Sequence, residues 1–372
     1  VKIYQIGDGN MKILCITNMY PSQKYPHYGV FVENFNRQIE FLGYNVKVLK
    51  ISKTDNIFIK YLKYIWLYTK ILYFLMFTKF DFAYVHYPAL TGIPVILAKK
   101  IKKNIKIISN VHGNDLVPEI ESDKKFVRYT NLVLKISEKI IVPSSYFENI
   151  VKKRFPNKQI IIYPSGGVDT DVFKTIDRTV SYDELNASSE YVYIGYIGRI
   201  EHNKGWDIFL KAFKLFISTV EYPEKYKAVI VGSGTEENNM KKMIHSLNLT
   251  KYILLDKLVE QKKVNLYMNI FSVFCFPTMR KSESLGLIGL EAMAAGTIVI
   301  ASDLYGPSSY IKDGKNGYSF RTGDAVDLSH KIGLAVVVDD KERKKIVLES
   351  KKTVNFYSEN NTCNSIKKIF GG

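Results

Sequence analysis

Two glutamates, Glu283 and Glu291, are separated by seven residues in a stretch that could carry chemistry. Good helix formers at 292–295, followed by a glycine, predict a helix that begins near 284–286. If the whole stretch were helical, the carboxylates would lie about 12 Å apart along the axis and on nearly the same face. Two carboxylates that hydrolyse a glycosidic bond lie closer, about 5–9.5 Å apart. The wider spacing favours a long ligand held at both ends.

The expected helix start lies between the two glutamates and offers unpaired N–H groups and the positive end of the helix dipole. Both of these favour a phosphate group. Each carboxylate could then accept hydrogen bonds from hydroxyl groups at one end of a nucleotide-diphosphate sugar. The alternative is an ordinary amphipathic helix with one solvated and one capping glutamate, because short patterns of this kind recur by chance.

A second candidate site follows the apolar segment 191–197, where Gly198-Arg199 is followed by Lys204-Gly205 and a helical pattern over 206–217. Charge-assisted hydrogen bonds to phosphate are characteristic of Arg and Lys side chains. The two cations could therefore hold a diphosphate. The alternative is a solvated loop that carries two cations by chance.

The N-terminal half offers two further candidates at the ends of expected strands. Gly29 lies in the loop after the strand 12–17, and His112 follows the strand 105–111. Ligands of parallel α/β sheets bind at the carboxyl ends of the strands, which is where both residues are expected. The alternatives are a turn glycine and a structural histidine.

These segments together resemble the retaining glycosyltransferases of family 4, which have the GT-B fold. The run 277–296 resembles the E-x7-E signature of that family, and 198–205 resembles its G-R-x4-K-G element. Residues 112–115 resemble its HG-x-D element, and 26–31 resemble its N-terminal glycine loop, with one glycine in place of two. The resemblance extends from residue 11 to about residue 350.

The resemblance implies a role for each matched residue. Glu283 would approach the donor sugar and Glu291 would bind the ribose hydroxyls. Arg199 and Lys204 would hold the diphosphate, and His112 would lie near the donor sugar and its phosphate. The implied catalytic residues are His112, Glu283, Arg199 and Lys204. The implied donor-binding residues are Gly29, Gly198, Arg199, Lys204, Ser284, Leu285, Gly286, Leu287 and Glu291.

No Asp-x-Asp metal motif accompanies the two C-terminal elements, so we expect no metal and no cofactor, with the nucleotide sugar as a substrate. The chain also departs from the family pattern. Lys257 stands where a glycine near the nucleobase is usual, and Ile298 replaces a common proline. A UDP-sugar is the favoured donor, while recognition of its base is in doubt.

The alternation of expected strands and helices predicts an α/β fold with parallel, doubly wound sheets. The resemblance implies GT-B architecture, two Rossmann-like domains with a cleft between them. We expect an acceptor domain at 11–173, a polar linker at 174–190 and a nucleotide-sugar donor domain at 191–345. A C-terminal helical segment at 346–372 is expected to cross back to the first domain.

The composition agrees with a two-domain intracellular enzyme. A chain of 372 residues exceeds one comfortable core, and its three widely spaced cysteines predict reduced thiols in a cytoplasmic protein. The net charge of +17 calls for an anionic partner, yet no nucleic-acid motif is recognisable. No secretory signal is visible, and residues 1–10 read as an upstream extension before Met11.

Residues 57–78 are almost wholly apolar and aromatic and are interrupted only by Lys60, Lys63 and Lys70. The longest uncharged run is too short to span a bilayer. On a helix the three lysines fall within an arc of about 80°. This pattern favours a helix in a membrane interface, with the lysines toward anionic headgroups. The alternative is a core helix whose lysines reach solvent.

The function expected from sequence is a retaining, metal-independent glycosyltransferase that uses a nucleotide sugar and a glycan or lipid-linked acceptor, in cell-surface polysaccharide synthesis. It would be cytoplasmic, with peripheral membrane contact through 57–78. One alternative is a UDP-sugar epimerase of the same fold. The other is a basic module, without enzymatic activity, that binds nucleic acid or an anionic surface.

Overall fold

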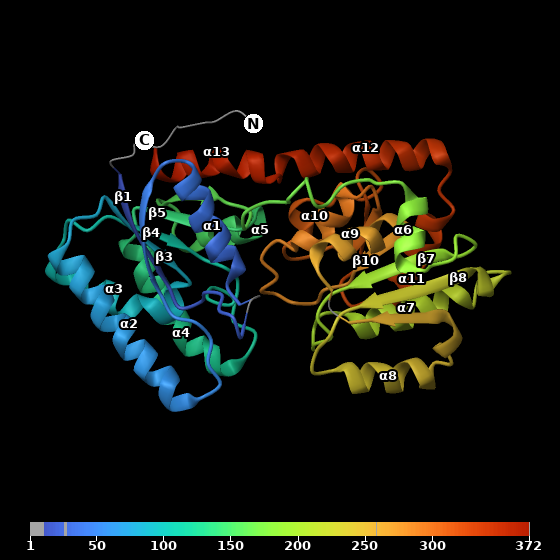
Figure 1. Cartoon of the computed structure of the whole chain (residues 1–372), viewed down its shortest axis with the longest axis horizontal. Coiled ribbons are helices and arrows are strands. Elements are labelled where there is room, and N and C mark those ends of the chain that lie inside the picture. The colour runs from blue at the N-terminus through green and yellow to red at the C-terminus, as the bar shows by residue number, and fades with distance from the viewer. Residues whose placement is uncertain (1–10, 26–27, 258, 372) are drawn as a thin grey trace. The chain divides into compact units, whose positions relative to one another are not determined.

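A computed structural model describes residues 11–25, 28–257 and 259–371. The chain forms two compact units (Figure 1). Unit 1 runs to Gly166 and takes up the C-terminal residues from Thr362, and unit 2 comprises Gly167–Asn361. The expected upstream extension at 1–10 lies outside the described residues, as do Pro26 and His27 of the N-terminal glycine loop.

Unit 1 is built on a six-stranded parallel sheet with the order β2-β1-β3-β4-β5-β6. This is a doubly wound order in which the chain reverses direction across the sheet between β1 and β3. The strands are β1 (Lys12–Thr17), β2 (Asn45–Lys50), β3 (Phe82–His86), β4 (Ile107–Asn110), β5 (Lys139–Val142) and β6 (Gln159–Ile162).

Helices cover both faces of this sheet, because alternate strand residues enter two different cores. Leu14 and Ile16 pack into one core with Leu67 of α2, while Ile13 packs into the other with Phe35 of α1. The helices are α1 (Val30–Phe41), α2 (Ile57–Phe77), α3 (Pro88–Ile101), α4 (Glu121–Ile136), α5 (Ser145–Arg154) and the end of α13 (Glu359–Phe370).

Unit 2 contains a second six-stranded parallel sheet, with the order β12-β11-β10-β7-β8-β9. Counted within the unit this is 6-5-4-1-2-3, the order of dinucleotide-binding folds, with the reversal between β7 and β10. The strands are β7 (Val192–Ile197), β8 (Tyr226–Val231), β9 (Ile253–Asp256), β10 (Phe271–Phe276), β11 (Ile298–Ser302) and β12 (Tyr318–Phe320).

The helices of unit 2 also bury both faces of their sheet. Ile194 and Tyr196 enter one core, and Tyr193 and Ile197 enter the other. The helices are α6 (Arg178–Leu185), α7 (Trp206–Ile217), α8 (Glu237–Ser246), α9 (Gln261–Ile270), α10 (Leu287–Ala294), α11 (Ala325–Val336), α12 (Asp340–Phe356) and the start of α13, with short 3-10 turns at Pro223–Lys225, Thr250–Tyr252 and Pro307–Ser309.

The segment expected as a linker, 174–190, has regular structure in unit 2. It contains α6, which packs against α9, and the compact units divide between Gly166 and Gly167. Helices α9 and α4 were not predicted. Asparagine is a poor former of helix interiors, but Asn265 and Asn269 of α9 accept N–H groups of the 174–176 backbone. Tertiary contacts therefore outweigh the low helix propensity of α9.

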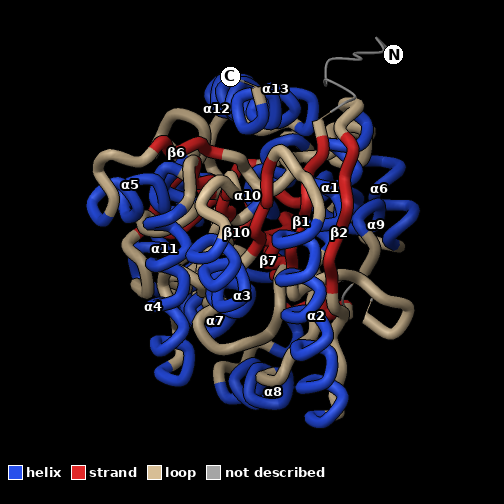
Figure 2. Tube along the Cα trace, turned by 90° about the vertical axis from the view of Figure 1, so that its left-hand side faces the viewer, coloured by secondary structure: helices blue, strands red, loops and turns tan. Residues whose placement is uncertain are grey.

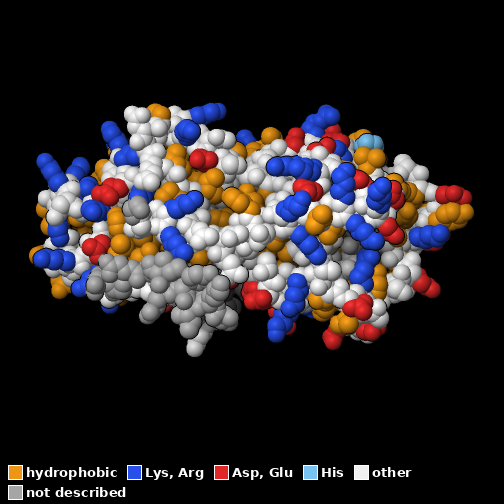
Figure 3. Space-filling model, turned by 90° about the horizontal axis from the view of Figure 1, so that it is seen from above, with side chains coloured by type: hydrophobic (Ala, Val, Ile, Leu, Met, Phe, Trp, Pro, Cys, Tyr) orange, Lys and Arg blue, Asp and Glu red, His pale blue; other side chains and the backbone are white. Residues whose placement is uncertain are grey.

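The basic residues do not form one continuous positive patch on the face drawn in Figure 3, because blue Lys and Arg side chains are interspersed with red acidic ones. Among the described residues, no helix combines the length and hydropathy needed to cross a membrane. All three cysteines are free thiols, and Cys15 and Cys275 are buried.

Candidate functional site

The candidate residues of unit 2 follow its two central strands. Gly198 to Lys204 come directly after β7, and Glu283 to Leu287 come after β10. These adjacent strands pair in parallel, so both loops leave the same edge of the sheet. This is the point of chain reversal, where parallel α/β sheets bind ligands.

The two loops are held together by backbone contact. The N–H of Met279 donates to the carbonyl of Asn203 at 2.9 Å. Gly205 has φ 78°, and a Cβ placed on it would lie 1.8 Å from the carbonyl oxygen of Pro277. Any other residue at this position would push the loops apart. Gly205 therefore allows the 198–205 loop, with Lys204, to approach the loop that carries Glu283.

Lys204 and Glu283 form an ion pair that joins the two loops. The lysine Nζ lies 2.7 Å from Glu283 Oε2, with only 14% and 13% of the two side chains exposed. The hydroxyl of Thr278 donates to the same oxygen at 3.1 Å. Burial alone would raise the pKa of Glu283, but the charge and hydrogen bond of Lys204 hold the pKa below its usual value. Glu283 is therefore ionised near neutral pH.

Arg199 has a different environment. Its side chain is 54% exposed, and its guanidinium pairs with Glu201 at 2.8 Å. Beneath the loop, the buried hydroxyl of Tyr196 donates to the carbonyls of Arg199 and Lys204 at 3.3 and 3.4 Å. The loop backbone is therefore fixed, while the arginine side chain remains accessible to an anion.

Helix α10 begins at Leu287, after Gly286 in a left-handed conformation. Glu283 therefore lies in the preceding loop, and the expected helix start at 284–286 is too early. The stretch from Glu283 to Glu291 is therefore not wholly helical, so the same-face geometry that a continuous helix would give does not apply. In the described part of the chain, the N–H groups of Leu287 and Ile288 have no protein acceptor. They supply the anion-binding geometry of a helix N-terminus.

Glu291 lies in the second turn of α10 and is partly exposed. Its carboxylate makes no hydrogen bond or ion pair to any described residue. Removal from water raises its pKa to about 7. A shielded carboxyl group with no protein donor is suited to accept hydrogen bonds from ligand hydroxyls.

The remaining two candidates lie in unit 1. Gly29 precedes α1, and a Cβ on it would lie 2.6 Å from the backbone carbonyl carbon of Met19, just beyond β1. Two residues later, the ring of Phe31 lies 4.6 Å from the ring of His112, which follows β4. The structure thus brings the Gly29 loop and His112 together at the carboxyl ends of the unit 1 strands.

His112 has a partner that the sequence did not reveal. The Nδ1 of His86, at the end of β3, lies 2.9 Å from His112 Nε2, and the rings stack. Burial lowers the pKa of His112 to about 3, and burial together with His112 holds the pKa of His86 well below its usual value. Both imidazoles are therefore neutral at physiological pH. The Nε2 of His86 is buried and has no partner among the described residues.

Asp115 of the same segment has a structural role. It is buried, and its carboxyl group accepts the N–H groups of His112 and Gly113 at about 2.9 Å. Burial raises its pKa to about 7, although these hydrogen bonds oppose the rise. Asp115 therefore shapes the turn that presents His112.

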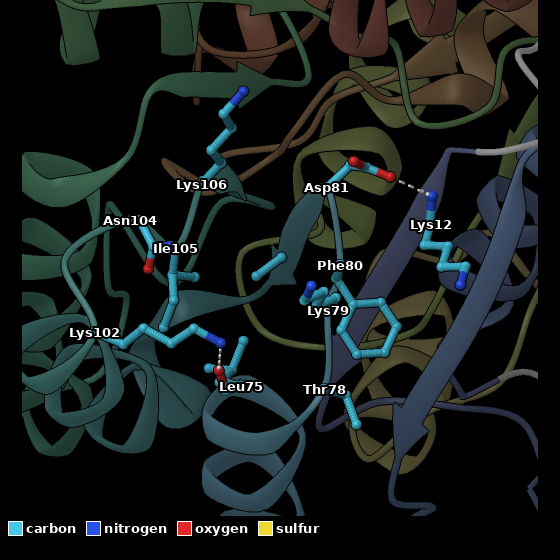
Figure 4. A pocket seen from close by; sticks show the side chains of 11 residues that line it. Lys12, Leu75, Thr78, Lys79, Phe80, Asp81, Lys102, Asn104, Ile105 and Lys106 are labelled. Atoms are coloured by element: carbon cyan, nitrogen blue, oxygen red, sulfur yellow. Dashed lines mark hydrogen bonds between the residues drawn. The ribbon is translucent and has the colours of Figure 1, made fainter.

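A cavity of about 480 Å³ lies away from these sites, at the opposite ends of β1, β3 and β4. Figure 4 shows Lys102 turned toward the carbonyl of Leu75, and Asp81 accepting the N–H of Lys12. These polar groups are satisfied by the protein, so we do not assign the chemistry to this cavity. Among the described residues, no group of three or more His, Cys, Asp or Glu could hold a metal ion.

Comparison with known proteins places this geometry in context. Residues 177–353 match the family model for glycosyl transferases group 1. The chain is 27% identical over 262 residues to lipopolysaccharide 1,2-N-acetylglucosaminetransferase of Salmonella typhimurium. That match covers 68% of this chain and 62% of the relative, so the chain spans less than two thirds of the relative's length.

Solved structures share the fold of nearly the whole chain. Sucrose-phosphate synthase of Thermosynechococcus elongatus superimposes with a TM-score of 0.78 at 16% identity, covering 97% of this chain and 98% of the other. Anabaena HepE in complex with UDP and glucose superimposes with a TM-score of 0.72 at 15% identity. The match covers 96% of this chain and 98% of HepE. The fold is GT-B, and the comparisons together support the glycosyltransferase superfamily.

Proposed function

We propose that this chain is a retaining glycosyltransferase of family 4 that transfers a sugar from a nucleotide-diphosphate sugar, with UDP as the favoured nucleotide, to a hydroxyl group of a glycan or lipid-linked acceptor. The observation that carries the proposal is the Lys204–Glu283 ion pair beside the free N–H groups of Leu287 and Ile288. A cation, a fixed carboxylate and a helix N-terminus gather where a parallel sheet binds ligands.

In the proposed reaction, unit 2 binds the donor. Leu287 and Ile288 would donate to the diphosphate, and Arg199 and Lys204 would neutralise the charge that develops as the bond to the sugar breaks. Glu291 would accept the ribose hydroxyls. Glu283, held ionised by Lys204, would accept a hydrogen bond from the sugar. The nucleotide diphosphate leaves with the bonding electrons, and the acceptor hydroxyl loses its proton to a phosphate oxygen.

Unit 1 is proposed to bind the acceptor and to supply His112. A neutral imidazole cannot stabilise charge as a cation, but it can donate or accept one hydrogen bond. The stack on His86 and the contact with Phe31 fix the plane of the His112 ring. No metal or cofactor has a role in this proposal, because Lys204, Arg199 and the helix N-terminus supply the positive charge.

Two measurements test the proposed function. A thermal-shift screen of nucleotide sugars should show stabilisation by the donor, since a ligand of the native state alone raises the melting temperature. The best donor is then incubated with lipid-linked and glycan acceptors, and the anomeric configuration of the product is determined by NMR. Retention of the α-configuration of the donor supports the proposal, and inversion contradicts it.

The same assay without acceptor distinguishes an epimerase from a transferase. An epimerase would convert the bound UDP-sugar to its epimer when no acceptor is present, whereas a transferase would leave it unchanged or hydrolyse it slowly. Addition of EDTA should leave transfer unchanged if the enzyme is metal-independent. A complete loss of activity that Mg²⁺ restores would contradict that part of the proposal.

We also propose a cytoplasmic, peripheral membrane location, with contact through α2. Many apolar and aromatic side chains of this helix are exposed, among them Phe58 (77%), Leu62 (66%), Ile65 (61%) and Trp66 (48%). Exposed apolar patches of this kind mark interaction surfaces. The opposite side of the helix buries Leu67, Ile71 and Leu75 in unit 1, so the core-helix alternative accounts for only one face.

A further inference from the structure

A second cavity, of about 170 Å³, lies at the carboxyl ends of β1 and β2 in unit 1. It is lined by residues after both strands and by the first turns of α2, namely Asn18, Tyr28, Ile51, Ser52, Lys53, Thr54, Lys60, Lys63 and Tyr64. Pockets that enclose whole small molecules measure about 300–1,000 Å³. This cavity therefore suits one terminal group of a larger ligand.

The lining residues favour an anion. Three lysines face the cavity, and none of the described residues that line it is acidic. Lys63 Nζ donates to the carbonyl of Ser52 at 3.1 Å, but Lys60 Nζ has no partner among the described residues. Asp55 interacts with Lys53 through its charge, but its carboxylate is already bound to Lys24 and Tyr25. Excess positive charge is thus left at the cavity.

One buried neutral polar atom at the cavity also lacks a partner among the described residues. Asn18 is 5% exposed, and its Oδ1 has no donor among the described residues. Its Nδ2 donates to the hydroxyl of Tyr64 at 3.1 Å, which leaves the O–H of Tyr64 to donate in turn. Buried polar groups without partners are costly, so a ligand that supplies both a donor and an acceptor would stabilise them. A protonated phosphate or a sugar phosphate does so.

The orientation of α2 connects this cavity with the exposed apolar surface. Lys60, Lys63 and Tyr64 lie on the same helix face as the buried Leu67 and Ile71. Lys60 and Lys63 of α2 thus line the cavity, so they can reach a headgroup phosphate only if that phosphate enters it. The third lysine of α2, Lys70, stacks over the ring of Trp66 at 3.9 Å.

The outward surface is extended by the neighbouring helix. Helices α2 and α3 lie side by side on one face of unit 1 (Figures 1 and 2). On α3, Ile93, Leu97 and Ile101 are 37%, 46% and 71% exposed, and their spacing of four residues places them in one stripe. Two adjacent helices thus present an apolar surface whose inner edge is the cationic cavity.

We propose that the cavity binds the phosphate group of a membrane lipid while the exposed faces of α2 and α3 lie in the interface, and that the lipid carrying this phosphate is the acceptor, with the phosphate as its anchor and not as the group that receives the sugar. The assignment as acceptor rests on the proposed transferase function. A lipid phosphate combines an apolar chain with a compact anion, which matches an apolar surface beside a small cationic cavity.

A second copy of the chain fits this surface poorly. Neither α2 nor α3 contains an acidic residue, and together with the residue after α3 they carry Lys60, Lys63, Lys70, Lys99, Lys100 and Lys102. Two such faces in contact would place like charges opposite each other without countercharges. An anionic membrane supplies the missing negative charge.

Co-sedimentation with liposomes tests the proposal on the full chain. The liposomes contain phosphatidylcholine alone or with phosphatidic acid, whose phosphate monoester is the probe. The test variant is Lys53→Gln/Lys60→Gln/Lys63→Gln. The control is Lys135→Gln/Lys152→Gln/Lys153→Gln, which removes the same charge from exposed positions on α4 and α5 of unit 1.

The wild-type protein should bind phosphatidic acid liposomes and not the neutral ones. At physiological salt the test variant should bind about tenfold or more weakly than the control. The single substitution Lys60→Gln should show part of this loss, and inorganic phosphate should not compete at equal concentration. Equal losses in the two triple variants would show diffuse charge attraction and would overturn the cavity assignment.

Other outcomes also contradict the proposal. Wild-type protein that stays in the supernatant with phosphatidic acid liposomes would reject the membrane lipid, and competition by free phosphate would reject a lipid source. Binding of UDP, measured on the same samples by calorimetry, reports on unit 2 alone. Liposome binding that fails while UDP binding persists rejects this inference and the membrane location but not the transferase, whereas absence of UDP binding rejects the proposed UDP donor.

Discussion

The strand ends of unit 2 and those of unit 1 occupy corresponding places in two parallel sheets, but their polar groups differ in how they are satisfied. In unit 2, Lys204 and Glu283 neutralise each other across two loops at 2.7 Å. In unit 1, Lys60 lacks a countercharge, and Asn18 Oδ1 and His86 Nε2 lack hydrogen-bond partners among the described residues.

This difference indicates two kinds of preparation for a ligand. The unit 2 site is pre-organised, since its cation and carboxylate are fixed before a donor arrives, and such sites need little reorganisation during reaction. The unit 1 sites are incomplete, since their unpaired polar and charged groups would gain partners when a ligand binds. We therefore expect substitutions in the Lys204–Glu283 pair of unit 2 to change both stability and binding, and those in unit 1 to change mainly binding and turnover.

The largest effect is expected for Glu283→Ala. Removal of the carboxylate leaves Lys204 unpaired and largely shielded from water, which should lower the free energy of unfolding by about 3 kcal/mol. Turnover should fall by on the order of 100-fold or more. Urea denaturation and initial-rate kinetics measure the two effects.

The double variant Lys204→Met/Glu283→Leu provides the control for Glu283→Ala. It should recover most of the lost stability without recovering activity, because apolar partners can replace an ion pair in packing but not in chemistry. A single variant as stable as wild type would contradict the view that the two loops are joined by this pair.

A smaller effect is expected for His112→Ala in unit 1, namely a loss of about 10–100-fold in turnover for one hydrogen bond to a charged group. UDP affinity and stability should change little. Because burial lowers the pKa of His112 to about 3, the imidazole is neutral above about pH 4. NMR titration of the His112 ring should show no protonation between pH 5 and 8, and a midpoint near 6.5 would contradict the assigned environment.

Glu291 should make nucleotide binding depend on pH. Its pKa of about 7 means that the carboxyl group is neutral below pH 7 and is then a poorer acceptor for two hydroxyl groups. UDP affinity should therefore fall as the pH is lowered from 8 to 6, by at most tenfold per unit. Glu291→Gln should bind more weakly at pH 8 and show a flatter profile. The same slope in both proteins would exclude Glu291 as its origin.

The smallest effect is expected for Arg199→Ala. The exposed guanidinium already pairs with Glu201, so its contact with a diphosphate should contribute about 1 kcal/mol, less than that of Lys204. Stability should remain within about 0.5 kcal/mol of wild type. Calorimetric titration with UDP and urea denaturation check both values. If Arg199→Ala weakened UDP binding more than Lys204→Ala does, Arg199 and not Lys204 would be the stronger contact to the diphosphate.

The sequence predicted the unit 2 loops because their residues are adjacent in the chain. Arg199 and Lys204 lie in one loop, Glu283 and Leu287 in another, and the order of strands places the loops side by side. A helix starting near 284–286 already placed Glu283 before the helix, but the sequence could not reveal that Gly205 must contact Pro277 or that Lys204 pairs with Glu283, because both depend on how the loops pack. The start of α10 at Leu287 is set by the left-handed Gly286.

The unit 1 sites could not be predicted in the same way. His86 and His112 come from different strands, and Asn18, Lys53 and Tyr64 come from two loops and a helix, so no local motif joins them. Helix α2 was predicted with nearly its observed bounds, but not its orientation. A helix that is apolar on almost every side gives no amphipathic pattern that fixes its buried face.

The most direct test of the pre-organised unit 2 site is UDP binding by Lys204→Ala, measured by isothermal calorimetry beside Lys211→Ala. Lys211 is a matched control because it pairs with Asp207 on the exposed side of the adjacent helix α7. We predict that Lys204→Ala weakens UDP binding by about 1.5–3 kcal/mol and that Lys211→Ala leaves it unchanged. Equal affinity for UDP in the wild type and both variants would contradict the assignment of the donor diphosphate to this site.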